Sequence, residues 1–292
     1  MKAPRRTTPP VAPPPDATFL RGRGDLRLYA AIDGPGTRGV VWFVLGPEVR
    51  SAPPYPRLTA ALHDAGLATA VLHARGTGFS DGLRGDIDDF ARVLDDHRLF
   101  LEHLADRFGR IVLLGHSVGA ALALELAAVS SDRLAGVVLV NPAWRLTYAE
   151  GMGPTLRDYV AYAINAVIRR SALTVDMNRA PSCVAFAPDR DEGEAMQRDP
   201  LVVRYFSLRY LMGERRVMAR CPGNAATSRA PLLLVQGAHD ALVDPSSFDA
   251  LLDAAAAPDK SKLVAAEGGH GSSAVETMVA PIVAWIVAHV DG

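Results

Sequence analysis

The chain has 292 residues, a net charge of −1 and a hydrophobic fraction of 49%. This length is ample for one α/β domain with an inserted segment, and the balanced charge excludes the basic footprint of a nucleic-acid-binding protein. No apolar run reaches membrane-spanning length, and two cysteines do not make a disulfide-stapled secreted domain.

Residues 1–18 differ in composition from the rest of the chain. Proline is frequent between Pro4 and Pro15, and it favours extended polyproline II backbone, so we expect an extended tail. The pair Arg5-Arg6 is reminiscent of a twin-arginine signal, but the apolar stretch that such a signal requires is missing. We therefore expect a cytoplasmic protein.

Apolar strands alternate with amphipathic helices from residue 25 onward, which favours a mostly parallel central sheet flanked by helices on both faces. The pattern predicts strands near residues 26–32, 39–46, 68–73, 110–114, 134–141, 231–236 and 262–266. It predicts helices near residues 55–65, 87–107, 118–129, 245–256 and 273–290.

The alternation stops between residues 144 and 228, which we predict to be a helical cap inserted into a core formed by residues 19–143 and 229–292. Apolar residues recur at helical spacing near residues 156–167 and again near 201–212. The charged stretch 187–194 between them is predicted to be a loop. Both cysteines, Cys183 and Cys221, fall in the cap; two free thiols are expected, and a disulfide between them is the alternative.

The sequence Gly115-His116-Ser117-Val118-Gly119 lies between an apolar strand and a helix-forming run. Strand, Gly-x-Ser-x-Gly and helix in this order are typical of a nucleophile elbow, in which a tight turn exposes the serine hydroxyl above the sheet. Side chains in place of the two glycines would strike the neighbouring strand and helix. Ser117 is therefore the candidate nucleophile.

A serine nucleophile requires a base and a carboxylate that orients the base. Asp240 and His270 each follow a predicted strand, and the carboxyl ends of parallel strands line one crevice. Asp244 follows the same strand as Asp240 and is the alternative acid, although it also suits the start of a helix. Other histidines fit less well: His116 points away from the serine hydroxyl, His73 ends a strand, and those at 63, 97 and 103 fall on predicted helices as solvated or capping residues.

These segments together resemble the α/β-hydrolases, and within them the group of monoacylglycerol lipases and serine aminopeptidases. The resemblance covers roughly residues 25–289 and includes the elbow, the segments 237–243 and 268–271, and the run 75–82, which is similar to the Arg-Gly-x-Gly-x-Ser loop of the family. It implies an α/β-hydrolase fold and the triad Ser117, Asp240 and His270. It also implies a scaffold role for Arg75.

The oxyanion hole departs from the family pattern. The resemblance implies one donor in the backbone N–H of Val118 and a second in the loop after the strand near 39–46. Where the family has His-Gly before the second donor residue, this chain has Leu45-Gly46-Pro47, and proline has no N–H. We expect the amide of Glu48 to replace it.

The sequence thus predicts a serine hydrolase that needs no cofactor and no metal, and cleaves a carboxylic ester with an apolar acyl group, such as a monoacylglycerol. One alternative is a thioesterase or acyltransferase with the same triad. The other is a hydrolase fold used for binding, which the unusual Pro47 favours. The expected partner is a small lipophilic ester.

Overall fold

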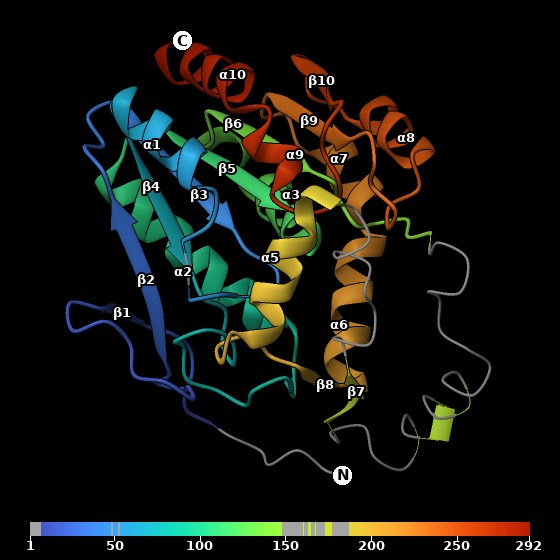
Figure 1. Cartoon of the computed structure of the whole chain (residues 1–292). Helices are drawn as coiled ribbons and strands as arrows, with labels where there is room; N and C mark the ends of the chain where they lie inside the picture. The colour runs from blue at the N-terminus through green and yellow to red at the C-terminus, as the bar shows by residue number, and fades with distance from the viewer. Residues whose placement is uncertain are drawn as a thin grey trace.

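The structure is a computed structural model that describes residues 7–47, 49–51, 53–147, 160, 163–164, 167, 173–176 and 187–292. Its centre is an eight-stranded sheet with the strand order β1-β2-β4-β3-β5-β6-β9-β10 (Figure 1). The strands are β1 (Thr18–Arg21), β2 (Arg27–Asp33), β3 (Gly39–Val44), β4 (Leu67–Leu72), β5 (Ile111–His116), β6 (Gly136–Val140), β9 (Leu232–Gly237) and β10 (Lys260–Ala265).

In the spatial order of the sheet, every neighbouring pair from β4 to β10 is parallel. The two antiparallel pairs are β1 with β2 and β2 with β4. This is the predicted mostly parallel sheet. The edge strand β1 was not predicted; it starts within the stretch expected to be a tail and is only four residues long. Such a short, half-exposed edge strand leaves no clear alternation of apolar and polar residues.

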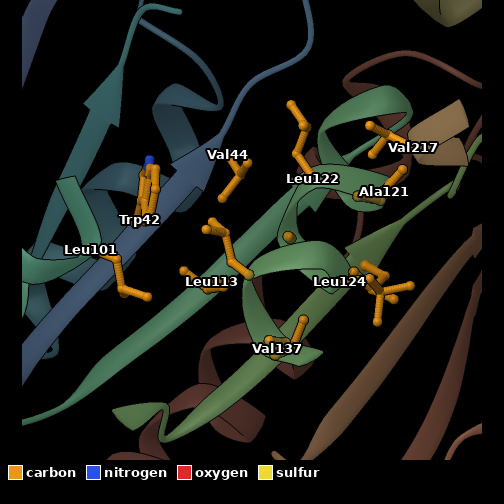
Figure 2. Packing of buried hydrophobic residues seen from close by; sticks show 14 of the residues in the cluster. Trp42, Val44, Leu101, Leu113, Ala121, Leu122, Leu124, Val137 and Val217 are labelled. Carbon is orange, nitrogen blue, oxygen red and sulfur yellow. The ribbon is translucent and has the colours of Figure 1, made fainter. Parts of the chain in front are cut away.

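Helices cover both faces of the sheet. α1 (Pro56–Asp64) and α10 (Val279–Asp291) pack on one face, and α2 (Ala91–Arg107), α3 (Val118–Ser130) and α8 (Ser246–Ala254) on the other. Side chains of the central strand β3 alternate accordingly: Trp42 faces the α3 side, whereas Phe43 faces the α1 side. Figure 2 shows Trp42 and Leu113 of the strands in the same cluster as Leu122 of α3.

The predicted helix at 273–290 is two helices, α9 (Ser273–Glu276) and α10. The break falls at Met278, whose φ of −117° and ψ of 23° are not helical. Pro281 explains it, because proline is tolerated in the first turn of a helix but not in the interior. α10 therefore starts just before Pro281 instead of continuing α9.

The segment between β6 and β9 contains β7 (Leu173–Asp176), α5 (Ala187–Arg198), β8 (Tyr205–Ser207), α6 (Leu208–Ala219) and α7 (Cys221–Thr227). α6 and α7 pack on α3 and add Val217, Cys221 and Ala225 to the hydrophobic core of that face. The boundaries of the predicted cap remain a prediction. Cys221 is a buried free thiol, whereas Cys183 lies outside the described residues.

Two predictions within this segment are wrong. The charged stretch 187–194 is the first part of α5 rather than a loop, and the predicted helix over 201–212 is replaced by β8 and the start of α6. α5 has little apolar surface, but it has Pro188 near its start, Asp189 in its first turn and an ion pair between Glu194 and Arg198 one turn apart. Of the predicted helix near 156–167, residues 160, 163, 164 and 167 are described, all of them helical and exposed.

Within the part of the chain that the structure describes, no helix is both long and apolar enough to cross a membrane.

Candidate active site

Ser117 stands at the turn between β5 and α3 with a φ of 56° and a ψ of −120°. A positive φ is unfavourable for a residue with a side chain and persists only where its surroundings impose it. Here the amide of Ser117 donates to the carbonyl of Val140 at 2.9 Å, and the Ser117 carbonyl accepts from the amide of Ala143 at 3.2 Å. The end of β6 therefore holds the turn in its strained form.

The glycines on either side of the turn have no room for a side chain. A Cβ on Gly119 would lie 2.0 Å from the carbonyl oxygen of Val44 in β3, and one on Gly115 would lie 2.5 Å from the carbonyl oxygen of Gly119. Both positions therefore require glycine, as the motif predicts.

The three side chains expected to act together do meet at the carboxyl ends of the strands. His270 Nε2 lies 3.0 Å from Ser117 Oγ, and His270 Nδ1 lies 2.8 Å from Asp240 Oδ2. The imidazole and the carboxylate are largely shielded from water, with 9% and 3% of their side-chain surface exposed. Asp244, the alternative acid, instead accepts hydrogen bonds from the amide and hydroxyl of Ser246 at the start of α8.

Asp240 is held as a carboxylate. Burial alone would raise its pKa, but the hydrogen bond and charge of His270 and the amides of Leu242 and Val243 outweigh burial and lower it. Those amides donate to Asp240 Oδ1 at 2.8 and 3.1 Å, which leaves Oδ2 for His270. The carboxylate can thus fix the imidazole with its Nδ1 proton toward Asp240 and its Nε2 toward the serine.

His116 supports the loop that carries His270. Its Nε2 lies 2.6 Å from the carbonyl oxygen of His270, and its Nδ1 lies 2.7 Å from the hydroxyl of Tyr55. A carbonyl only accepts, so Nε2 carries the proton and Nδ1 accepts from Tyr55. Burial, and next the proximity of His270, lower the pKa of His116 to about 4, so the imidazole is neutral at pH 7.

Asn141 was not singled out from the sequence, although it directly follows β6. It is fully buried with a φ of 44°, a conformation that asparagine tolerates better than most residues. Its side chain accepts from the amide of Gly237 and donates to the carbonyl of Gly269, both at 2.8 Å. Asn141 therefore ties the segments that carry Asp240 and His270 to β6.

The loop after β3 passes beside the elbow, as an oxyanion hole requires. A Cβ on Gly46 would lie 3.6 Å from Cβ of Val118 and 3.7 Å from the amide nitrogen of Gly119. Val118 is the first residue of α3, and amides in the first turn of a helix have no intrahelical acceptor. The second expected donor, Glu48, lies outside the described residues.

The remaining predicted residues have structural positions. Arg75 makes a buried ion pair with Asp96, with contacts of 2.6 and 2.7 Å, in keeping with a scaffold role. His73 is buried and accepts from the amide of Phe79 at 3.0 Å; burial lowers its pKa to about 3. The expectation of a solvated or capping His97 is wrong, because its ring is buried and stacks on Trp42.

The family described as "Serine aminopeptidase, S33" matches residues 37–274. The chain belongs to this family. The monoacylglycerol lipase of Mycolicibacterium smegmatis is 27% identical to it over 246 residues, which cover 82% of this chain and 84% of that protein. The monoglyceride lipase of Homo sapiens is 26% identical over 268 residues, covering 88% of this chain and 84% of that protein.

Solved structures agree with this membership. The monoacylglycerol lipase of Paleococcus ferrophilus superimposes with a TM-score of 0.73 at 25% identity, over 90% of this chain and 99% of that one. A soluble variant of the Saccharomyces cerevisiae monoglyceride lipase gives 0.76 at 17% identity, over 97% of this chain and 99% of that one, which is a likeness of fold. The predicted α/β-hydrolase fold is confirmed, and so is the assignment as a serine hydrolase of the esterase and lipase kind.

Proposed function

We propose that the chain hydrolyses a carboxylic ester with an apolar acyl group through an acyl-enzyme on Ser117, with His270 as general base and Asp240 as the orienting acid. The observation that carries the proposal is the continuous hydrogen-bonded series from Ser117 Oγ through His270 to Asp240, at 3.0 and 2.8 Å. These distances lie in the range at which a base can take the proton of its nucleophile.

In the first half of the reaction, Ser117 Oγ attacks the acyl carbonyl carbon and its proton passes to His270 Nε2. The carbonyl oxygen becomes an oxyanion, which accepts a hydrogen bond from the amide of Val118 at the positive end of α3. The bond to the leaving alcohol then breaks, and the alcohol takes the proton from His270. The acyl group remains on Ser117.

Water completes the cycle. His270 takes a proton from the water as its oxygen attacks the acyl carbonyl, and then returns that proton to Ser117 Oγ as the carboxylic acid leaves. Asp240 stays ionised throughout and stabilises the imidazolium, in line with its lowered pKa. We keep Glu48 as the proposed second oxyanion donor, because Pro47 has no amide proton.

An apolar acyl group is favoured by apolar side chains that neighbour the triad residues in the chain. Val118 and Leu242, each within two residues of a triad member, pack against the α3-side core together with Trp144, Leu146 and Leu211, and all five are partly buried. Trp144 and Leu146 follow Ala143, whose amide bonds to Ser117. We propose that residues 144–228 form a cap that covers the acyl group, and that the substrate is a monoacylglycerol or a similar small lipid ester, as in the lipases it resembles.

The proposal is tested with a series of p-nitrophenyl esters from acetate to dodecanoate and with a monoacylglycerol, using the wild-type chain and Ser117→Ala in parallel. We expect turnover that depends on Ser117 and increases from acetate to longer acyl chains. Turnover of thioesters with none of oxygen esters would favour the thioesterase alternative and contradict the proposal.

A further inference from the structure

The main-chain amides that directly follow His270 are bound by carboxylates from a distant segment, helix α5. Asp189 accepts from the amides of Gly271 and Ser273, both at 3.0 Å, with one carboxylate oxygen each. Glu192 accepts from the amide of Ser272 at 2.8 Å and also from its hydroxyl. Three consecutive amides after the histidine are therefore held by two side chains of α5, which lies next to α9 in Figure 1.

The position of these carboxylates makes the contacts strong. Asp189 has only 1% of its surface exposed, and a buried carboxylate is costly unless hydrogen bonds replace its water. Hydrogen bonds to a charged acceptor are also stronger than those between neutral groups. These hydrogen bonds therefore stabilise both the position of α5 and the backbone conformation of residues 271–273.

The same helix reaches the loop after β3, residues 45–55, on which the second oxyanion donor is expected. Glu192 forms an ion pair with Arg50 at 2.7 Å, both side chains being mostly shielded from water. Burial by itself would raise the pKa of Glu192, but the Arg50 charge and the Ser272 hydrogen bonds together outweigh burial and lower it. Asp199, one residue beyond α5, accepts from the amide and hydroxyl of Ser51 at 2.6 and 2.8 Å.

We propose that α5 positions His270 for catalysis, with Asp189 and Glu192 as positioning residues that also connect the histidine loop to the loop after β3. The inference rests on the proposed function, since it concerns the base of that triad. Neither carboxylate contacts the nucleophile; each acts through the backbone next to His270. A displacement of about 1 Å in a catalytic group lowers the rate by as much as roughly 100-fold, which is the order of effect that loss of this support should produce.

The test compares Asp189→Ala, the milder Asp189→Asn, and Glu192→Ala with a matched control, Glu194→Gln. Glu194 is another carboxylate of α5, but it is exposed and pairs with Arg198 of the same helix. Initial rates are measured with a p-nitrophenyl ester, and reactive serines are counted by titration with a fluorophosphonate. Turnover per titrated site is independent of any unfolded fraction, so a purely structural role would not change it.

We expect Asp189→Ala to lower kcat per titrated site by about 10- to 100-fold while KM changes by less than about twofold. Asp189→Asn retains an oxygen acceptor, so its kcat per titrated site should fall less than that of Asp189→Ala. Glu192→Ala should also lower kcat and slow the reaction with the fluorophosphonate, whereas Glu194→Gln should leave both unchanged.

A second variant tests the same contact from the other side. Gly271 lies so close to Asp189 that a Cβ would come within 2.6 Å of the Asp189 carboxylate carbon. Gly271→Ala should therefore displace Asp189 and reduce kcat as Asp189→Ala does. The kcat of the double variant Asp189→Ala/Gly271→Ala should be no lower than that of either single variant, because both substitutions remove the same interaction.

Two results would overturn the inference, and they are distinguishable. If the wild-type chain shows turnover that requires Ser117 and the Asp189 and Glu192 variants keep its kcat per titrated site, α5 does not position His270 and the proposed function stands. If the wild-type chain neither turns over esters nor reacts with the fluorophosphonate, the proposed function fails and the inference fails with it.

Discussion

His116 donates a hydrogen bond from Nε2 to the main-chain carbonyl of His270 at 2.6 Å. The residue just before the proposed nucleophile thus supports the residue that would activate it. Because His116 is partly buried and neutral at pH 7, its protonation would weaken this contact and with it the support of His270.

The stability of the chain should fall on mild acidification because of His116. Burial lowers its pKa from 6.5 to about 4, so between these values the unfolded chain binds a proton that the folded chain excludes. The free energy of unfolding therefore rises with pH across this window and falls as the pH drops through it. The titration of His116 alone should lower the free energy of unfolding by about 2 kcal/mol between pH 7 and pH 5.

Urea unfolding of wild type and His116→Gln at both pH values measures this contribution. Glutamine can donate to His270 and accept from Tyr55 without titrating, so the variant should lose about 2 kcal/mol less than wild type. His73 also has a lowered pKa, but it is present in both chains, so its contribution cancels from the difference between them. Equal losses in the two chains would contradict the assignment.

Asp240 and Asp244 should differ sharply in their effect on catalysis. Asp240→Asn leaves an amide facing His270, which favours the wrong tautomer of the imidazole, so kcat should fall by about 10⁴-fold. Asp244 contacts Ser246 instead, and Asp244→Asn should keep nearly all activity. Steady-state kinetics of the two variants decide between the two acids; a larger loss for Asp244→Asn would reverse the assignment.

The buried pair of Arg75 and Asp96 should contribute to stability rather than to chemistry. The two side chains are 6% and 0% exposed, so Arg75→Ala leaves an uncompensated buried carboxylate and should cost about 3–5 kcal/mol. The exposed pair of Arg21 and Asp25 is the control, because Arg21→Ala at the surface should change the free energy of unfolding by less than about 1 kcal/mol. Denaturant titration measures both.

The glycine after the nucleophile should not accept even one methyl group. Gly119→Ala would bring Cβ within 2.0 Å of the Val44 carbonyl, and we expect loss of folded protein or of activity, by expression level and thermal unfolding. A Cβ on Gly223 in α7 would meet no atom of another segment within 4 Å, so Gly223→Ala should stabilise the chain by about 0.5–1 kcal/mol. Tolerance of Gly119→Ala with unchanged kcat would show that the elbow is less tight than these distances indicate.

Much of the fold is readable from the sequence because local signals and tertiary structure agree. Buried parallel strands such as β5 and β9 are apolar runs followed by polar or glycine residues. Ser117 directly follows β5, and Asp240 and His270 lie in the loops just after β9 and β10. The parallel order of the strands then brings residues far apart in the chain to one edge of the sheet.

The errors occur where contacts across the chain, rather than local patterns, decide the structure. α5 is polar and was predicted to be a loop, but its carboxylates bind amides of residues 271–273. The role of Asn141 depends on two segments more than ninety residues away in the chain. Neither relationship leaves a periodic signal in the sequence.

Every step of the proposed reaction depends on Ser117 being an activated nucleophile. Intact-protein and peptide mass spectrometry after treatment with a fluorophosphonate tests it without knowledge of the substrate. We predict one adduct per chain, located on the peptide that contains Ser117, absent from Ser117→Ala and formed much more slowly in His270→Ala. No adduct on the folded wild-type chain, or an adduct that persists in Ser117→Ala, would show that Ser117 is not the activated nucleophile.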